Sequence, residues 1–114
     1  ADQLKAINAA TTGAITLSDT DDALSDTIAD LVSAFTGTVT AYTGAITISD
    51  AAGTDIDATD LSDIGGETSG LVTVTNAIDI SGTASEVTAA LVTTDTLVVA
   101  ATATATISDA AGTR

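Results

Sequence analysis

The feature that most constrains the fold is an internal duplication. The octapeptide TISDAAGT occurs twice without a change, at residues 47–54 and 106–113. Two more pairs of segments match at nearly the same offset, residues 4–19 with 61–76 and residues 24–35 with 80–91. We therefore divide the 114 residues into two repeat units, 1–57 and 58–114, that together form one domain.

A shorter element recurs inside each unit. A pentapeptide of alternating apolar and hydroxyl side chains that ends in Asp or Asn occurs four times, as ITLSD at 15–19, ITISD at 46–50, VTVTN at 72–76 and ATISD at 105–109. Strict alternation is typical of a strand with one buried face. We expect a strand at each of the four places.

Helical patterns follow the strands. Between residues 28 and 35 the apolar side chains recur at the i, i+3, i+4 and i+7 positions of one helical face. Thr27 and Thr83 each precede an acidic residue by three positions, which is the spacing of a helix N-terminal cap. The segments between each helix and the next strand are rich in β-branched residues and predict a further strand or two.

Repeat periods of 20–50 residues are typical of solenoids, in which neighbouring units bury each other's faces. We therefore predict a mainly β fold, a parallel β-solenoid (β-helix) of about four coils, two in each unit. Each coil is expected to contain two or three short strands and one short helix. A β-sandwich of two homologous halves is the competing architecture, although sandwiches rarely place a helix in every unit.

The composition excludes several classes of function. Lys5 and Arg114 are the only cations against 16 acidic residues, a net charge of −14, so the chain lacks the basic patch that nucleic acids or anionic membranes require. It has no His and no Cys, which removes Ser-His-Asp and Cys-His catalysis and thiolate metal sites. No apolar run is long enough to insert in a membrane. We predict a protein that is not an enzyme. The alternative is a glycoside hydrolase, since that activity requires a pair of carboxylates and acidic residues are abundant.

Hydroxyl side chains are the first candidate site. If the four pentapeptides stack in register, two outward columns arise. They contain Thr16, Thr47, Thr73 and Thr106 in one and Ser18, Ser49, Thr75 and Ser108 in the other. Such columns resemble the Thr-x-Thr arrays of ice-binding solenoids and would make an adhesion or ice-binding face. The alternative is that Thr is placed there because β-branched residues favour the outer side of a strand.

The residues that end the pentapeptides are the second candidate site. Asp19, Asp50, Asn76 and Asp109 would form a ladder at the turn that follows the strand. Further acidic residues lie nearby, namely Asp21, Asp22, Asp55, Asp57 and Asp79. Calcium prefers such oxygen ligands, so Ca²⁺ is the one cofactor that the pattern allows. No EF-hand loop and no calcium-binding nonapeptide is present. The alternative is that Asp and Asn are ordinary turn residues that bond their own backbone.

The strings AITISDAAGT and VTVTNAIDIS, with the elements at 24–35 and 81–91, resemble the Thr/Ala/Asp-rich tandem repeats of giant secreted or cell-surface proteins of marine cyanobacteria and other bacteria. Some members of that group carry hemolysin-type calcium-binding segments, and others act in adhesion or motility. The resemblance implies an extracellular or cell-surface location and carries no catalytic residue.

The ends of the chain resemble its middle. DAAGTR at the end matches DAAGTD at 50–55, and ADQL at the start matches ATDL at 58–61, so one copy could follow another with a deletion of two residues. We expect the chain's partner to be a further copy of itself. The predicted function is a structural repeat module of an extracellular array or fibre that stacks end to end. The alternatives are the adhesion or ice-binding face and a Ca²⁺-stabilised adhesin repeat.

Overall fold

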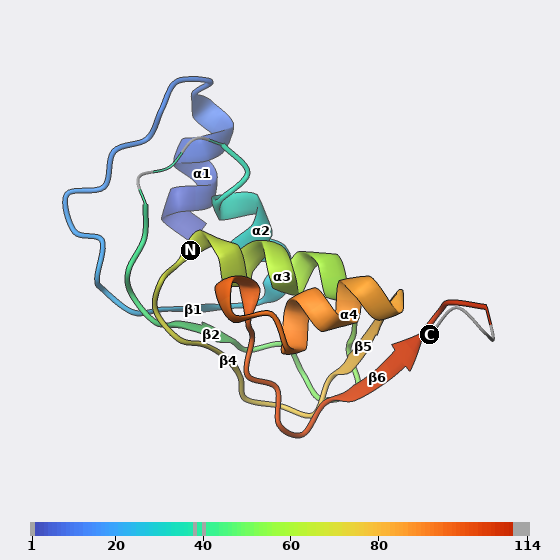
Figure 1. The fold of residues 1–114 in the computed structure, drawn as a ribbon. Coiled ribbons are helices and arrows are strands. Elements are labelled where there is room, and N and C mark those ends of the chain that lie inside the picture. Colours follow the sequence, from blue (N-terminus) through green and yellow to red (C-terminus); the bar gives the residue numbers. More distant parts are fainter. Residues whose placement is uncertain (1, 38, 40, 111–114) are drawn as a thin grey trace.

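The computed structural model describes residues 2–37, 39 and 41–110 (Figure 1). Arg114 and the last residues of the second TISDAAGT lie outside the described residues. The elements are α1 (Asp2–Ala10), β1 (Leu24–Asp26), α2 (Ile28–Ala34), β2 (Ile46–Ile48), β3 (Asp55–Asp57), α3 (Ala58–Glu67), β4 (Val72–Val74), β5 (Asp79–Gly82), α4 (Ala84–Leu91), the 3₁₀ helix η1 (Thr94–Thr96) and β6 (Thr104–Ile107).

The strands form two parallel three-stranded sheets. Their orders are β1-β2-β4 and β3-β5-β6. The helices lie in a row beside the strands, with α1 against α2, α2 against α3 and α3 against α4 (Figure 1). The molecule is elongated, with extents of 46 × 24 × 23 Å. The pairs β2–β4 and β3–β5 therefore cross the boundary between the two repeat units, and α2 and α3 continue the helix row across it.

The core lies between the sheets and the helix row. Ile46 and Ile48 of β2 are fully buried, and Leu61 of α3 belongs to the same buried cluster. Ala34 and Ala90 are also completely buried, and their small side chains let neighbouring helices approach closely. The two aromatic residues of the chain, Phe35 and Tyr42, meet edge to face. A composition rich in alanine thus builds a thin core from close helix contacts.

The predicted helix caps are confirmed. The Thr27 side chain accepts a hydrogen bond from the Asp30 backbone N–H at the start of α2. Thr83 and Glu86 form a complete capping box at the start of α4. These local polar contacts satisfy backbone N–H groups that a helix N-terminus leaves without partners.

The prediction of a mainly β, parallel β-solenoid is wrong. The structure is a small mixed α/β domain in which 35% of the described residues are helical and 23% are in strands, and these elements do not close into a solenoid. Two local features explain the difference. β1 leads into α2 without a second strand, and Ala-rich segments favour helix over strand.

One of the four predicted strands is missing. Residues 15–19 lie in the long segment between α1 and β1, where Ile15 forms an isolated parallel bridge with Val39. The extra strands expected before residues 46 and 104 are reduced to single bridges at Val39, Tyr42 and Val99 and to the start of β6. Residues 38 and 40 of the first of these segments lie outside the described residues. Among the helices that are described, none is long and apolar enough to span a membrane.

Candidate functional site

The structure brings together only part of the predicted hydroxyl face. Thr47 and Thr73 are paired across β2 and β4, and the row continues to Ser25 on one side and Val99 on the other. Ser49 and Thr75 follow these two strands and are exposed. Two adjacent rungs of the predicted four are therefore present.

The other two rungs lie elsewhere. Thr16 and Ser18 are exposed in the segment between α1 and β1. Thr106 belongs to β6 in the second sheet, where it pairs with Ser81, and Ser108 follows it. Within the described residues, the hydroxyl side chains form no continuous four-rung column.

The predicted aspartate ladder has a different role at two of its positions. The Asp50 carboxylate, which is 9% exposed, accepts a 2.7 Å hydrogen bond from the backbone N–H of Ile28, the first residue of α2. The Asp109 carboxylate accepts in the same way from the backbone N–H of Ala84, the first residue of α4. Each aspartate thus places its negative charge at the positive N-terminal end of a helix that precedes it in the chain, α2 for Asp50 and α4 for Asp109.

The remaining members of the ladder lie apart. Asn76 donates from its amide Nδ2 to the backbone oxygen of Asp50, at 2.7 Å. Asp19 lies in the exposed segment before β1. Among the described residues, Asp19, Asp50 and Asp109 do not converge on a common point that could hold a metal ion. Nothing in the local sequence pattern distinguishes a capping Asp from a ligand, because the helix that it caps is 22 or 25 residues earlier in the chain.

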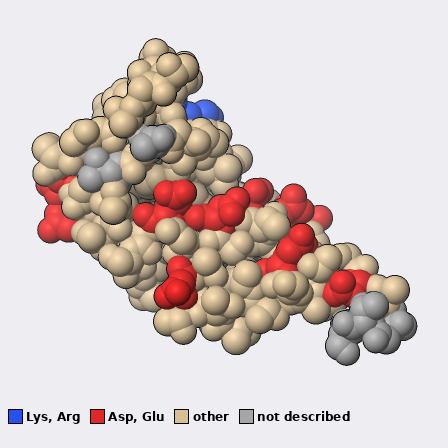
Figure 2. Space-filling model, turned by 45° about the horizontal axis from the view of Figure 1, so that its top comes forward, with Lys and Arg blue, Asp and Glu red and all other residues tan. Residues whose placement is uncertain are grey.

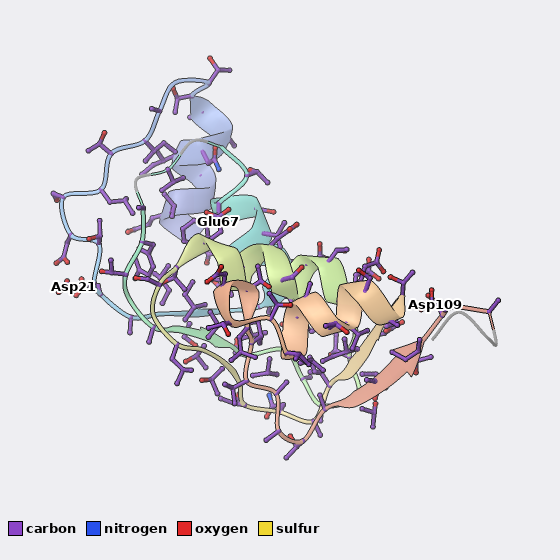
Figure 3. The ribbon with its side chains drawn as sticks, in the orientation of Figure 1. Asp21, Glu67 and Asp109 are labelled. Carbon is purple, nitrogen blue, oxygen red and sulfur yellow. The ribbon has the colours of Figure 1, made fainter. Side chains whose placement is uncertain are left out.

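Asp19, Asp21 and Asp22 do form a compact group. One carboxylate oxygen from each lies within 4.8 Å of the others, and all three side chains are exposed. The Asp19 carboxylate raises the pKa of the Asp21 carboxyl above its usual range, because it accepts a hydrogen bond from the protonated Asp21 and repels its charged form. Figure 3 places Asp21 on the long loop before β1, at the opposite end of the molecule from Asp109. With one oxygen from each residue the group supplies three of the six to eight oxygens that calcium takes, so further ligands would have to complete such a site.

A second acidic group is partly neutralised by one lysine. Asp2, Asp26 and Asp30 converge at the start of α2, where Lys5 Nζ forms a 2.6 Å ion pair with Asp30 Oδ1. The hydrogen bond from Lys5 lowers the pKa of Asp30, and Asp30 in turn raises the pKa of Lys5. Figure 2 shows acidic side chains in red across the face that it draws and a blue cationic area at the upper edge of that face.

A cavity opens beside the C-terminal end of α3. It has a volume of about 500 Å³ and is lined by residues 41–43, 65–70, 94, 95 and 97. Glu67 lies at its rim, and burial raises the pKa of this carboxyl above its usual range. The Tyr42 hydroxyl is buried and has no hydrogen-bond partner among the residues that the structure describes, and burial raises its pKa. The lining also contains the hydroxyl side chains of Thr68 and Ser69 and the carboxylate of Asp95.

Large apolar side chains are exposed at both ends of the helix row. Ile7 of α1 is 52% exposed, and Val92, directly after α4, is 69% exposed. Ile64, which stands at the position of Ile7 in the second repeat unit, is buried. Comparison of the chain with protein-family models, with curated proteins and with solved structures finds no match.

Proposed function

We propose that this chain is a structural repeat module without catalytic activity whose copies stack end to end. The observation that supports this is the joint between the two halves of the chain. There β2 pairs with β4 and α2 packs against α3. In the second half, the strand β6 corresponds to β2 and the helix α4 corresponds to α2.

The open edge of β6 supports the same proposal. Among the described strands, β6 pairs only with β5, and Thr104, Ala105 and Thr106 are exposed. An exposed strand edge is a template for pairing with another chain unless charge, proline or a cover blocks it. The residues of β6 are uncharged, and the sequence has no proline.

The chemistry of the side chains supports a structural role over a catalytic one. A chain without His or Cys cannot assemble the commonest nucleophile–base pairs. The abundant acidic groups keep the module soluble, because like charges on neighbouring stacks repel each other and oppose lateral aggregation. The extracellular or cell-surface location stays a prediction of the sequence.

Sedimentation velocity from micromolar to millimolar protein tests this function, with electron microscopy of the same samples. We expect species that lengthen with concentration while their width stays constant. A single monomeric species over the whole range would contradict end-to-end stacking. Compact particles of fixed size would show that the copies form a closed oligomer and do not stack end to end.

A further inference from the structure

The two halves of the chain occupy equivalent places in the structure. β1 pairs with β2 as β5 pairs with β6, with Ser25 beside Thr47 and Ser81 beside Thr106. α1 packs against α2 as α3 packs against α4. The capping bonds of Asp50 and Asp109 to the starts of α2 and α4 complete the correspondence. Each contact of the first half can therefore be compared with its counterpart in the second.

The internal joint provides a template for a contact between copies. A small cleft of about 150 Å³ between α2 and α3 shows which side chains face each other across that joint. Val32, Phe35 and Thr36 line it from the α2 side, and Asp63, Ile64 and Glu67 line it from α3. Ile64 is 1% exposed because α2 covers it.

The counterparts of these residues are exposed at the two ends of the helix row. Ile7 of α1 corresponds to Ile64 and is 52% exposed, because no helix covers that side of α1 in the described structure. Val92 corresponds to Thr36 and is 69% exposed. The α1 end of the row thus exposes Ile7 and the α4 end exposes Val92. Their counterparts, Ile64 and Thr36, line the same cleft of the internal joint.

The other residues of this surface also suit a contact between copies. Ala6 and Ala10 of α1 stand where α3 has Asp63 and Glu67. A joint between α4 and the α1 of another copy therefore lacks the two carboxylates of the internal joint. It would bury apolar area without burying a charge, which is the favourable case for association.

The strands extend the same comparison. β2 is paired on both edges, with β1 and with β4, and its Ile48 is completely buried. β6 is paired on one edge, and its Ile107, the counterpart of Ile48, is half-buried. The segment that corresponds to β4 in the first half is 15–19, where Ile15 pairs with Val39 much as Thr73 of β4 pairs with Val99.

We infer that α4 and β6 of one copy receive α1 and residues 15–19 of a second copy, so that Val92 packs on Ile7 of that copy and Thr106 lies beside Thr16 of that copy. This inference depends on the proposed end-to-end stacking and specifies its two surfaces. The contact is heterologous, since the two surfaces differ, and it can therefore repeat without limit.

Single charges at the two surfaces test the inference. Val92→Asp disables the α4 surface and Ile7→Asp disables the α1 surface. Leu71→Asp is the matched control, because Leu71 is 60% exposed and precedes β4, away from both end helices. We expect Val92→Asp and Ile7→Asp each to be monomeric in sedimentation velocity, with circular dichroism unchanged, while Leu71→Asp assembles like the wild type.

Mixing the two monomeric variants is the decisive measurement. The intact α1 surface of Val92→Asp can bind the intact α4 surface of Ile7→Asp, so a one-to-one mixture should form dimers and nothing larger. If Val92→Asp and Ile7→Asp assemble as well as the wild type, or if their mixture stays monomeric, the inference is wrong while end-to-end stacking itself stands. A wild-type chain that is monomeric throughout would overturn both.

Disulfide cross-linking tests the strand register separately. The chain has no cysteine, so Thr16→Cys with Thr106→Cys introduces the only two thiols. We expect oxidation to produce a ladder of linked chains. Thr47→Cys with Thr73→Cys should instead close a bond within one chain, since these residues are paired across β2 and β4. A ladder no stronger than that of Thr16→Cys with Thr59→Cys, which places the second thiol on exposed α3 surface, would refute the register.

Discussion

Replacing Asp50 with alanine tests how the halves of this chain are held together. Asp50 follows β2, yet its carboxylate bonds to the first backbone N–H of α2, which lies 22 residues earlier. The substitution leaves the Ile28 N–H without its acceptor in a buried place. It also removes the negative charge at the positive end of that helix.

The structure sets the size of the effect. A hydrogen bond to a charged group contributes about 1.5–3 kcal/mol, and loss of an N-terminal helix cap costs about 1 kcal/mol. These two numbers describe one interaction, so we expect Asp50→Ala to lower the free energy of unfolding by about 2 kcal/mol. For a domain of this size the melting temperature should fall by about 10 °C.

Net charge works against this effect. The chain has a net charge of −14, so removing any acidic residue relieves self-repulsion and by itself should stabilise the fold. A loss of stability in Asp50→Ala therefore cannot come from the change in overall charge. Asp50→Asn keeps an acceptor oxygen without the charge, and we expect it to lose about half as much as the alanine variant.

Urea unfolding followed by far-ultraviolet circular dichroism provides the measurement, because the chain has no tryptophan. Asp63→Ala is the control. Asp63 is exposed on α3, and its charge raises the pKa values of Asp60 and Glu67, so its removal should be neutral or stabilising. If Asp50→Ala lies within about 0.5 kcal/mol of Asp63→Ala, the effect is that of an ordinary surface substitution and the capping argument fails.

Three further outcomes are expected. Thr83→Ala removes the hydroxyl of the capping box and should cost about 1 kcal/mol in the same urea assay, and an unchanged midpoint would contradict that role. The folded-state pKa values of Asp21, Asp60 and Glu67 are raised, the first by Asp19 and the other two chiefly by burial. As the pH falls, these carboxyls bind protons in the folded state at a higher pH than in the unfolded state, which stabilises the folded state. The melting temperature should therefore rise as the pH is lowered from 7 toward about 4. A steady decrease of the melting temperature over this range would contradict the prediction. Sodium chloride should raise the melting temperature by screening the negative charge, and the calcium prediction requires a further rise in CaCl₂ of equal ionic strength that Asp21→Asn abolishes.

Local pattern was sufficient for several features of this protein. Alternation of side chains located the strands that became β2 and β4, because each needs one buried face whatever its neighbour is. The spacing of Thr83 and Glu86 located a helix start, since both partners of the capping box lie within one turn. The composition alone excluded catalysis by His or Cys.

Tertiary structure decided which segments became neighbours. The pentapeptides at 46–50 and 105–109 have nearly the same sequence, yet one pairs in the first sheet and the other in the second. The pentapeptide at 15–19 alternates equally well and forms no strand. The role of Asp50 likewise depended on where α2 starts in space. Alternation specifies which face of a strand is buried, but pairing and long-range capping depend on partners 22 or more residues away, and only the packing of the whole chain selects them.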